Sequence, residues 1–170
     1  AGLAMPLTDT QYGSVMIGDT IQAAIAAGRL FQCDYAALRV LSESAADQSA
    51  VKYLYAPAAV LAVHPETGAL VPVAIQPRPI GRNASTRANE VFVADGSCDW
   101  LIAKTIVEMA DGNLHEAVSH LGRTHLFVEP FIVSMFRNFP TGHAVADLLW
   151  PHFEGTVFIN YAATQTLVAP

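Results

Sequence analysis

Histidine is the residue type that could carry chemistry in this sequence. Five of the six histidines fall between His115 and His152, and His115, His120 and His125 follow one another at intervals of five. In a regular α-helix, side chains five residues apart point about 140° apart, too far for two imidazoles to bind one ion. A π-helical turn reduces that separation to about 50°, and Gly122 tolerates such a distortion. Shared metal binding by two of these histidines therefore predicts a helix with a π turn.

The chemistry open to this series is metal binding, because imidazole suits iron, copper, nickel and zinc. The competing interpretation of each histidine alone is a hydrogen-bonded core residue. The stretch His115-Glu116-x-x-x-His120 is similar to the zinc-protease motif, but that motif places its histidines four apart on an unbroken helix. Glu116 is therefore expected to be a structural acid or a partner of a ligand, not a general base. Spacing alone leaves open which pair binds.

Local patterns in the first half of the chain predict a short helix and a hairpin. Asp19 is the expected N-cap of a helix from Thr20 to Ala27, and Gly28 stands where a left-handed residue ends a helix. Two apolar stretches, 58–63 and 69–75, flank the sequence His-Pro-Glu-Thr-Gly, which favours a turn. These stretches predict a β-hairpin.

The second half of the chain has a helical pattern. It starts at Asp99, the expected N-cap, and is apolar on most faces, which is typical of a helix inside a larger protein. Pro130, Pro140 and Pro151 are each expected to end or kink the preceding helix. The segment 154–167 stays open, since strand propensity near its start competes with helical spacing further on.

Composition points to a segment of a larger domain. The 170 residues are 52% hydrophobic and only 14% charged, with mean hydropathy +0.34, whereas a complete domain carries about 25% charged residues. The lack of a methionine at Ala1 and the stop at Pro170 agree with that interpretation.

Charge and run length exclude two classes of partner. The net charge is −6 with nine scattered lysines and arginines, so nucleic-acid binding is excluded. The longest mainly apolar run, 53–63, is too short for a transmembrane helix. The compartment, cytoplasmic or secreted, stays open. Cys33 and Cys98 lack a CxxC partner and are expected to be small buried residues without a function.

A longer pattern around the histidines resembles the lipoxygenases, and it covers nearly the whole chain. Its parts are Trp100-x-x-Ala103-Lys104, His115-x4-His120-Leu121-x-x-Thr124-His125-x-x-x-Glu129-Pro130-Phe131, Arg137-x-x-Pro140, Leu148-Leu149-x-Pro151-His152 and Ile159-Asn160. Earlier segments such as Pro6-x-Thr8-Asp9 and Asp34-Tyr35-Ala36 are similar to the bacterial branch of the family.

This resemblance implies a mainly α fold. Residues 1–170 would be a partial lipoxygenase catalytic domain, with a long central helix containing a π turn and a small β-hairpin. The implied activity is that of a non-haem iron dioxygenase, with iron preferred over manganese. It inserts O2 into polyunsaturated fatty acids that contain a cis,cis-1,4-pentadiene and yields hydroperoxides. The implied partners are the fatty acid, O2 and the remainder of the catalytic domain, in the same protein or in a second chain.

The resemblance also implies roles for particular residues. By position, His120 and His125 are the metal ligands, and no catalytic residue is expected beyond them. Three residues are expected beside the ligands without binding metal: His115, Glu116 and Asn160. Ala163 matches a position that steers the side of oxygen attack. The remaining pocket residues would be Leu121, Leu126 and Leu167.

The sequence departs from the family pattern in three ways. Ala144 replaces the usual proline after His143, and Thr164 replaces a frequent arginine after Ala163. The family's further ligands, a third histidine, commonly an asparagine, and a C-terminal isoleucine carboxylate, are not among these 170 residues. His143 and His152 are not substitutes by position and are expected beside helix breaks, far from the central pair. The chain alone is therefore expected to be inactive.

Two alternatives belong to other classes. One is a truncated, inactive helical module that binds lipid or another protein. The other is an independent metalloenzyme whose site uses His115, His120 and His125 with His143 or Glu116.

Overall fold

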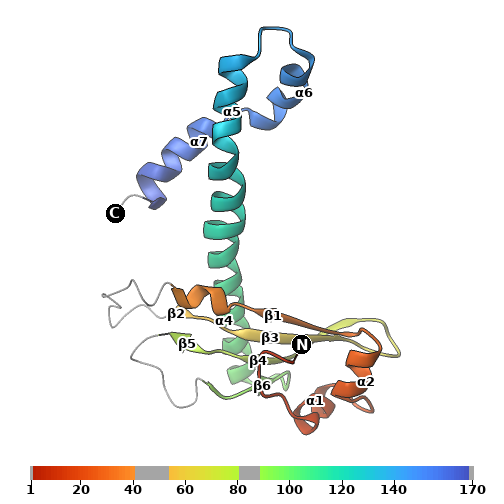
Figure 1. Ribbon diagram of the computed structural model, residues 1–170. Coiled ribbons are helices and arrows are strands. Elements are labelled where there is room, and N and C mark those ends of the chain that lie inside the picture. Colours follow the sequence, from red (N-terminus) through yellow and green to blue (C-terminus); the bar gives the residue numbers. More distant parts are fainter. Residues whose placement is uncertain (1, 41–53, 81–88, 169–170) are drawn as a thin grey trace. The chain divides into compact units, whose positions relative to one another are not determined.

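The computed structural model describes residues 2–40, 54–80 and 89–168. The chain forms two compact units, Ala1–Gly112 and Asn113–Pro170, called unit 1 and unit 2 below. The main elements are labelled in Figure 1.

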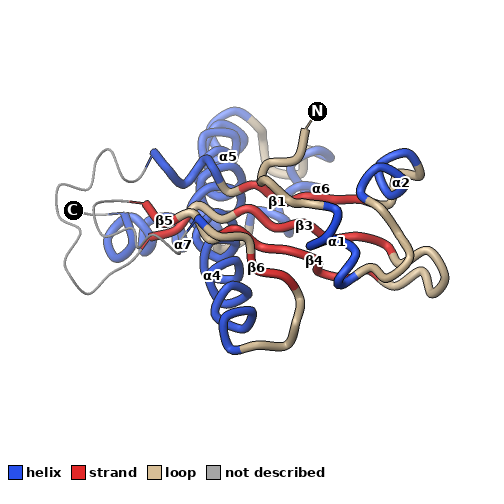
Figure 2. Tube along the Cα trace, turned by 90° about the horizontal axis from the view of Figure 1, so that it is seen from below, coloured by secondary structure: helices blue, strands red, loops and turns tan. Residues whose placement is uncertain are grey.

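Unit 1 contains a four-stranded antiparallel sheet. The strand order is β1-β3-β4-β6, with β1 at Leu30–Asp34, β3 at Ala58–Val63, β4 at Leu70–Gln76 and β6 at Phe92–Val93. The four strands lie side by side in Figure 2. β3 and β4 pair from Val63 opposite Leu70 to Ala58 opposite Gln76, so the predicted hairpin is confirmed. The outer strands β1 and β6 were not predicted. A separate strand pair consists of β2 (Leu54–Tyr55) and β5 (Pro79–Ile80).

Side chains pack on both faces of the hairpin. Alternate residues of a strand point to opposite sides, so neighbouring residues of β3 belong to different clusters. Ala58, Val60 and Ala62 belong to one cluster, which includes Tyr12 and Met16. Ala59, which lies between Ala58 and Val60, belongs to a second cluster on the other face. This cluster also contains Ile75 of β4 and Trp100 and Ala103 of the helix that begins at Cys98. The small side chains of β3 therefore allow packing on both faces of the sheet.

Two short helices, α1 (Asp9–Val15) and α2 (Ile21–Ala26), and a 3₁₀ turn, η1 (Ala36–Arg39), complete the N-terminal part. Thr20, and not Asp19, is the N-cap of α2, since its hydroxyl accepts from the backbone N–H of Ala23 at 3.2 Å. The prediction for Asp19 was wrong because its carboxylate is engaged elsewhere. Gly28 has a φ of +66°, which confirms the predicted left-handed end of the helix.

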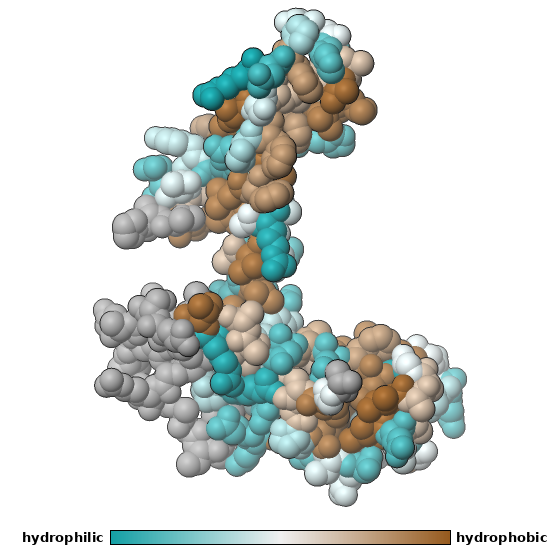
Figure 3. Space-filling view, viewed as in Figure 1, coloured by the Kyte–Doolittle hydropathy of each residue, from teal (hydrophilic) through white to brown (hydrophobic). Residues whose placement is uncertain are grey.

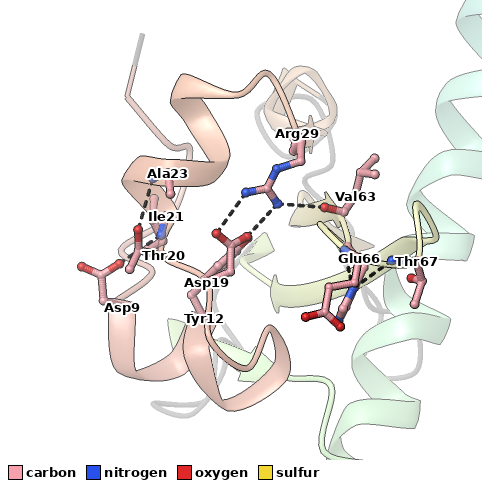
Figure 4. Close-up of polar contacts among 11 residues, drawn as sticks. Asp9, Tyr12, Asp19, Thr20, Ile21, Ala23, Arg29, Val63, Glu66 and Thr67 are labelled. Atoms are coloured by element: carbon pink, nitrogen blue, oxygen red, sulfur yellow. Dashed lines mark hydrogen bonds and ion pairs between the residues drawn. The ribbon is translucent and has the colours of Figure 1, made fainter.

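Asp19 forms the polar centre of unit 1 (Figure 4). Its carboxylate accepts from the Arg29 guanidinium at 2.7 and 3.0 Å and from the Tyr12 hydroxyl at 2.9 Å. Arg29 also donates to the carbonyl of Val63 at 2.9 Å. Hydrogen bonding from Arg29 lowers the pKa of Asp19 to about 2, whereas burial and the nearby Asp19 raise the pKa of Tyr12 to about 12. The cluster ties the α1–α2 region to the end of β3.

From Cys98 onward, the described part of the chain is mainly helical. α4 (Cys98–Leu114) continues without a break into a π-helix, η3 (His115–Leu126), and then into α5 (Phe127–Asn138). α6 (Ala144–Phe153), α7 (Thr156–Ala163) and a second π segment, η4 (Thr164–Val168), follow. The long helix with its π segment is therefore confirmed, and the segment 154–167 is resolved as helix.

One helix cap needs correction, and the three prolines differ in their positions. Ser97 caps α4 by accepting from the N–H of Trp100 at 3.1 Å, so Asp99 lies inside the first turn and is not the N-cap. Pro140 follows the end of α5 as predicted, whereas Pro130 and Pro151 lie inside α5 and α6 and do not end them. Pro130 comes four residues after the π segment ends, where the backbone hydrogen-bond register changes and one missing N–H is tolerated more easily.

The two cysteines are exposed and free, so the expectation that they are buried was wrong. Cys33 lies on β1, which pairs only with β3 among the described strands, and Cys98 is the first residue of α4. Among the described residues, no helix is long and apolar enough to cross a membrane.

Candidate metal centre

The π-helix η3 carries the histidine series. All twelve residues from His115 to Leu126 have π geometry, which extends the predicted single turn. Hydrogen bonds from i to i+5 bring residues five apart onto one face. Gly122 fits this winding because a Cβ there would lie 3.1 Å from the carbonyl oxygen of Ala117. A histidine spacing of five is thus matched to the local backbone.

The imidazoles of His120 and His125 meet. Their Nε2 atoms lie 3.2 Å apart, with the rings edge to face and the ring centres 4.7 Å apart. Two nitrogen ligands about 2.1 Å from one ion, at an angle of about 90–110°, are separated by roughly 3.0–3.4 Å. The observed separation therefore fits two ligands of a single ion.

The other ring nitrogens of the two histidines face acceptor side chains. Nδ1 of His120 lies 3.1 Å from Oε2 of Glu116, and Nδ1 of His125 lies 3.1 Å from Oδ1 of Asn160. Both partners are acceptors, so in each neutral imidazole the proton is on Nδ1 and Nε2 keeps its lone pair. In that tautomer both Nε2 lone pairs face the same point, which is the arrangement that two ligands of one cation require. Hydrogen bonding to His120 also lowers the pKa of Glu116.

Asn160 links α7 to the histidine helix. Its side chain is buried, and its Nδ2 donates to the carbonyl of His125 at 2.8 Å and to Oε2 of Glu129 at 2.7 Å. The structure thus places Glu116 beside His120 and Asn160 beside His125. Glu129 received no role from the sequence. Its place four residues after His125 on the same helix was the signal that could have identified it.

His115 lies next to the pair. Its ring stacks on that of His120 at 5.7 Å with planes 10° apart, and its Nε2 lies 3.9 Å from Oε1 of Glu116. Ligand atoms of His115, Glu116 and His120 all lie within 4.8 Å of one another, so these three residues form a second possible cation site. That site would have to share His120 with the first. The two arrangements make different predictions for His115.

The two later histidines differ in their surroundings. His143 is the N-cap of α6, accepts from the N–H of Val145 at 3.3 Å, and stacks on Phe139. His152 lines a cavity of about 280 Å³ together with His125, so the expectation that it lies far from the central pair was wrong. Packing of α6 against α5 accounts for this proximity.

The four expected pocket residues lie on three elements of unit 2. Ala163 is buried, one turn beyond Asn160 on α7. Leu121 and Leu126 lie on η3, and Leu126 lines a cavity of about 470 Å³ that extends along α5 to Asn138. Leu167 lies on η4 and is 76% exposed.

A π-helix that presents two imidazoles to one point can supply two ligands to a metal ion. The lipoxygenase family model matches residues 5–170. The chain therefore belongs to the lipoxygenase family of dioxygenases, and the resemblance noted in the sequence is confirmed.

Relatives from distant organisms agree. The chain is 37% identical over 171 residues to linoleate 9/13-lipoxygenase of Pseudomonas aeruginosa, covering 96% of this chain and 24% of that protein. It is 32% identical over 168 residues to seed linoleate 9S-lipoxygenase of Glycine max, covering 95% of this chain and 19% of that protein. The chain thus spans about a quarter or less of the length of these relatives.

A solved structure shares the fold. The structure of manganese lipoxygenase of Gaeumannomyces graminis, which includes part of zonadhesin of Komagataella pastoris, matches with a TM-score of 0.80 at 18% identity. The match covers 99% of this chain and 28% of that one. The family uses a non-haem metal, iron or manganese.

Proposed function

We propose that this chain provides two metal ligands, His120 and His125, and part of the substrate pocket of a fatty-acid dioxygenase. The reaction inserts O2 into a polyunsaturated fatty acid with a cis,cis-1,4-pentadiene and yields a hydroperoxide. The observation that carries the proposal is the pair of Nε2 atoms 3.2 Å apart on a π-helix. The family assignment supports the reaction class.

The proposed metal is iron. Imidazole ligands suit iron, whereas manganese favours carboxylate, carbonyl and water oxygens. When bound, the metal supplies the one-electron oxidant for the bis-allylic C–H bond. Glu116 and Asn160 hold the two Nδ1 protons, which leaves both Nε2 atoms free to bind.

The pocket residues have a different task. Ala163 is buried close to Asn160 on α7, and its single methyl group leaves room for O2 on one side of the substrate. Leu121, Leu126 and Leu167 provide apolar walls that exclude water from a substrate radical. No charged side chain of this chain needs to act as an acid or a base in these steps.

Unit 2 leaves much apolar surface for the remainder of the catalytic domain. Exposed fractions are 64% for Phe127, 60% for Phe131, 69% for Leu148 and 74% for Phe158. Part of this surface is visible as brown in Figure 3. Soluble proteins rarely leave so many large apolar side chains uncovered in one place. We propose that residues 1–170 are part of a catalytic domain whose remainder covers these helices and completes the ligand set.

The test uses the full-length protein that contains this chain. The protein is loaded with ferrous iron without oxygen, mixed with linoleate and O2, and followed by conjugated-diene absorbance and mass spectrometry of the hydroperoxide. His120→Gln and His125→Gln should each lower turnover at least 100-fold and release the iron. His64→Gln is the matched control, because His64 lies in the hairpin turn of unit 1.

Two results would contradict the proposal. One is wild-type turnover in either ligand variant. The other is an iron-loaded wild-type protein that binds linoleate without oxidising it, which favours the inactive lipid-binding alternative.

A further inference from the structure

The side-chain amide of Asn160 can adopt only one orientation. Two acceptors without any hydrogen to donate lie near it, the carboxylate of Glu129 at 2.7 Å and the backbone carbonyl of His125 at 2.8 Å. Both require the NH2 group, so the amide oxygen is left facing Nδ1 of His125 at 3.1 Å. A flipped amide would place its oxygen against two other oxygens. The buried position leaves no water to compensate for that exchange.

The orientation of the amide then decides the tautomer of His125. An amide oxygen accepts a hydrogen bond, so Nδ1 must carry the proton and Nε2 must carry the lone pair. Nε2 is the atom that faces His120. Glu129 therefore acts on His125 through Asn160, without any contact with a metal.

The backbone supplies a second reason for this arrangement. Pro130 has no N–H, so it cannot donate to the carbonyl five residues before it, that of His125. The Nδ2 of Asn160 donates to this same carbonyl. The side chain from α7 thus makes a hydrogen bond that Pro130 cannot make, at the point where π geometry changes to α geometry.

We propose that Glu129 and Asn160 form a positioning pair that fixes the tautomer and ring orientation of His125 for metal binding. The proposal rests on the function proposed above, because it takes His125 as a metal ligand. It also links two parts of the site. Ala163 lies one turn after Asn160, so the pair that orients His125 also fixes α7 beside η3.

The test measures metal affinity and not turnover. Wild-type and variant full-length proteins are titrated with Fe2+ without oxygen, and separately with Co2+, against a competing chelator. The Co2+ absorption spectrum reports the ligand field. Thermal unfolding of each metal-free protein reports folding. Loss of a hydrogen-bond partner behind a metal-bound histidine lowers affinity about 10–100-fold, and this range is expected for Asn160→Leu.

Two variants that move the carboxylate from residue 129 to residue 160 distinguish a positioning role of the pair from a role in packing alone. Asn160→Asp keeps an acceptor for His125 but places two carboxylates about as close as the present contact of 2.7 Å with Glu129. Glu129→Gln in that background restores a donor. The double variant should bind metal at least tenfold more tightly than Asn160→Asp alone and should recover the wild-type Co2+ spectrum. This pair of variants also tests the proposal if Asn160→Leu does not fold.

Asn113→Leu is the matched control, because Asn113 is exposed on α4 and makes no side-chain hydrogen bond among the contacts that the structure describes. It should leave metal affinity within twofold of the wild type. The inference is overturned, with the proposed function intact, if the wild type binds metal and Asn160→Leu binds it equally well. It is also overturned if the double variant is no better than Asn160→Asp. A wild-type protein that takes up no metal contradicts the proposed function itself.

Discussion

Replacing Asp19 by asparagine should destabilise unit 1 by about 2 kcal/mol at neutral pH. The carboxylate accepts two hydrogen bonds from Arg29 and one from Tyr12, and its side chain is only 5% exposed. Asparagine keeps one acceptor oxygen but turns an NH2 group towards the guanidinium or the hydroxyl. A hydrogen bond to a charged group contributes about 1.5–3 kcal/mol, so losing one accounts for the expected effect.

The lowered pKa of Asp19 gives a second estimate of the stability that unit 1 loses in Asp19→Asn. Hydrogen bonding from Arg29 lowers that pKa from 3.8 to about 2. At 1.36 kcal/mol per unit, the difference is worth at most about 2 kcal/mol, which agrees with the first figure. Because the folded-state pKa is the lower one, this stability is present above about pH 4 and is lost as the pH falls through 2. The difference between wild type and Asp19→Asn should shrink over that window.

Hydrogen exchange followed by mass spectrometry measures this effect directly. Peptides covering residues 9–34 should lose about 30-fold in protection in the variant at pH 6, which corresponds to about 2 kcal/mol. Asp34→Asn is the control, because Asp34 pairs with Arg78 at 2.9 Å but is 39% exposed. Exposed pairs contribute at most about 1 kcal/mol, so protection should change less than about fivefold. Equal effects of the two variants, or a difference that persists at pH 2, would refute the reasoning.

Three further substitutions test other parts of the structure. Ala163→Gly should shift oxygenation towards the opposite face and a neighbouring carbon, as removing a methyl group opens space for O2, and chiral chromatography of the hydroperoxides checks this; an unchanged product profile counts against the pocket assignment. His115→Ala should keep iron affinity, measured by chelator competition, within twofold of the wild type. A tenfold loss of affinity would instead indicate that the ion binds to His115, Glu116 and His120. Tyr35→Phe should cost unit 1 about 1 kcal/mol, because the Tyr35 hydroxyl donates to Asp111 at 2.8 Å. Thermal unfolding measures that loss, and an unchanged midpoint argues against it.

Local signals predicted the elements that depend on local residues. The hairpin followed from its turn chemistry, and the left-handed Gly28 followed from its place after an alanine-rich helix. The cap of α2 was misjudged because Asp19 and Thr20 both suit an N-cap. A pairing with Arg29, ten residues away, decided between them. Capping rules contain no term for such a tertiary contact.

The outer strands could not be predicted in the same way. β1 pairs Leu30 with Ala62 across more than thirty residues of chain, and its five residues show little alternation of burial. β6 has only two residues. Strands this short are defined by their partners and not by their own sequence.

In the candidate site, too, some features followed from local sequence and others depend on contacts between distant residues. A histidine spacing of five, taken together with shared metal binding, predicted a π turn, since only that winding brings both rings to one side. The choice of His120 and His125 came from the family pattern. Asn160 lies 35 residues from His125 and entered through the family pattern alone. The role of Glu129 depends on an amide orientation that only the packed structure defines.

The central claim is that one metal ion is shared by Nε2 of His120 and Nε2 of His125. Anomalous scattering at the iron absorption edge, from crystals of the iron-loaded full-length protein, locates the ion directly. The account predicts a single peak within bonding distance of both Nε2 atoms and outside bonding distance of His115. A peak between Nδ1 of His120 and the carboxylate of Glu116, or no peak near this helix, would contradict it.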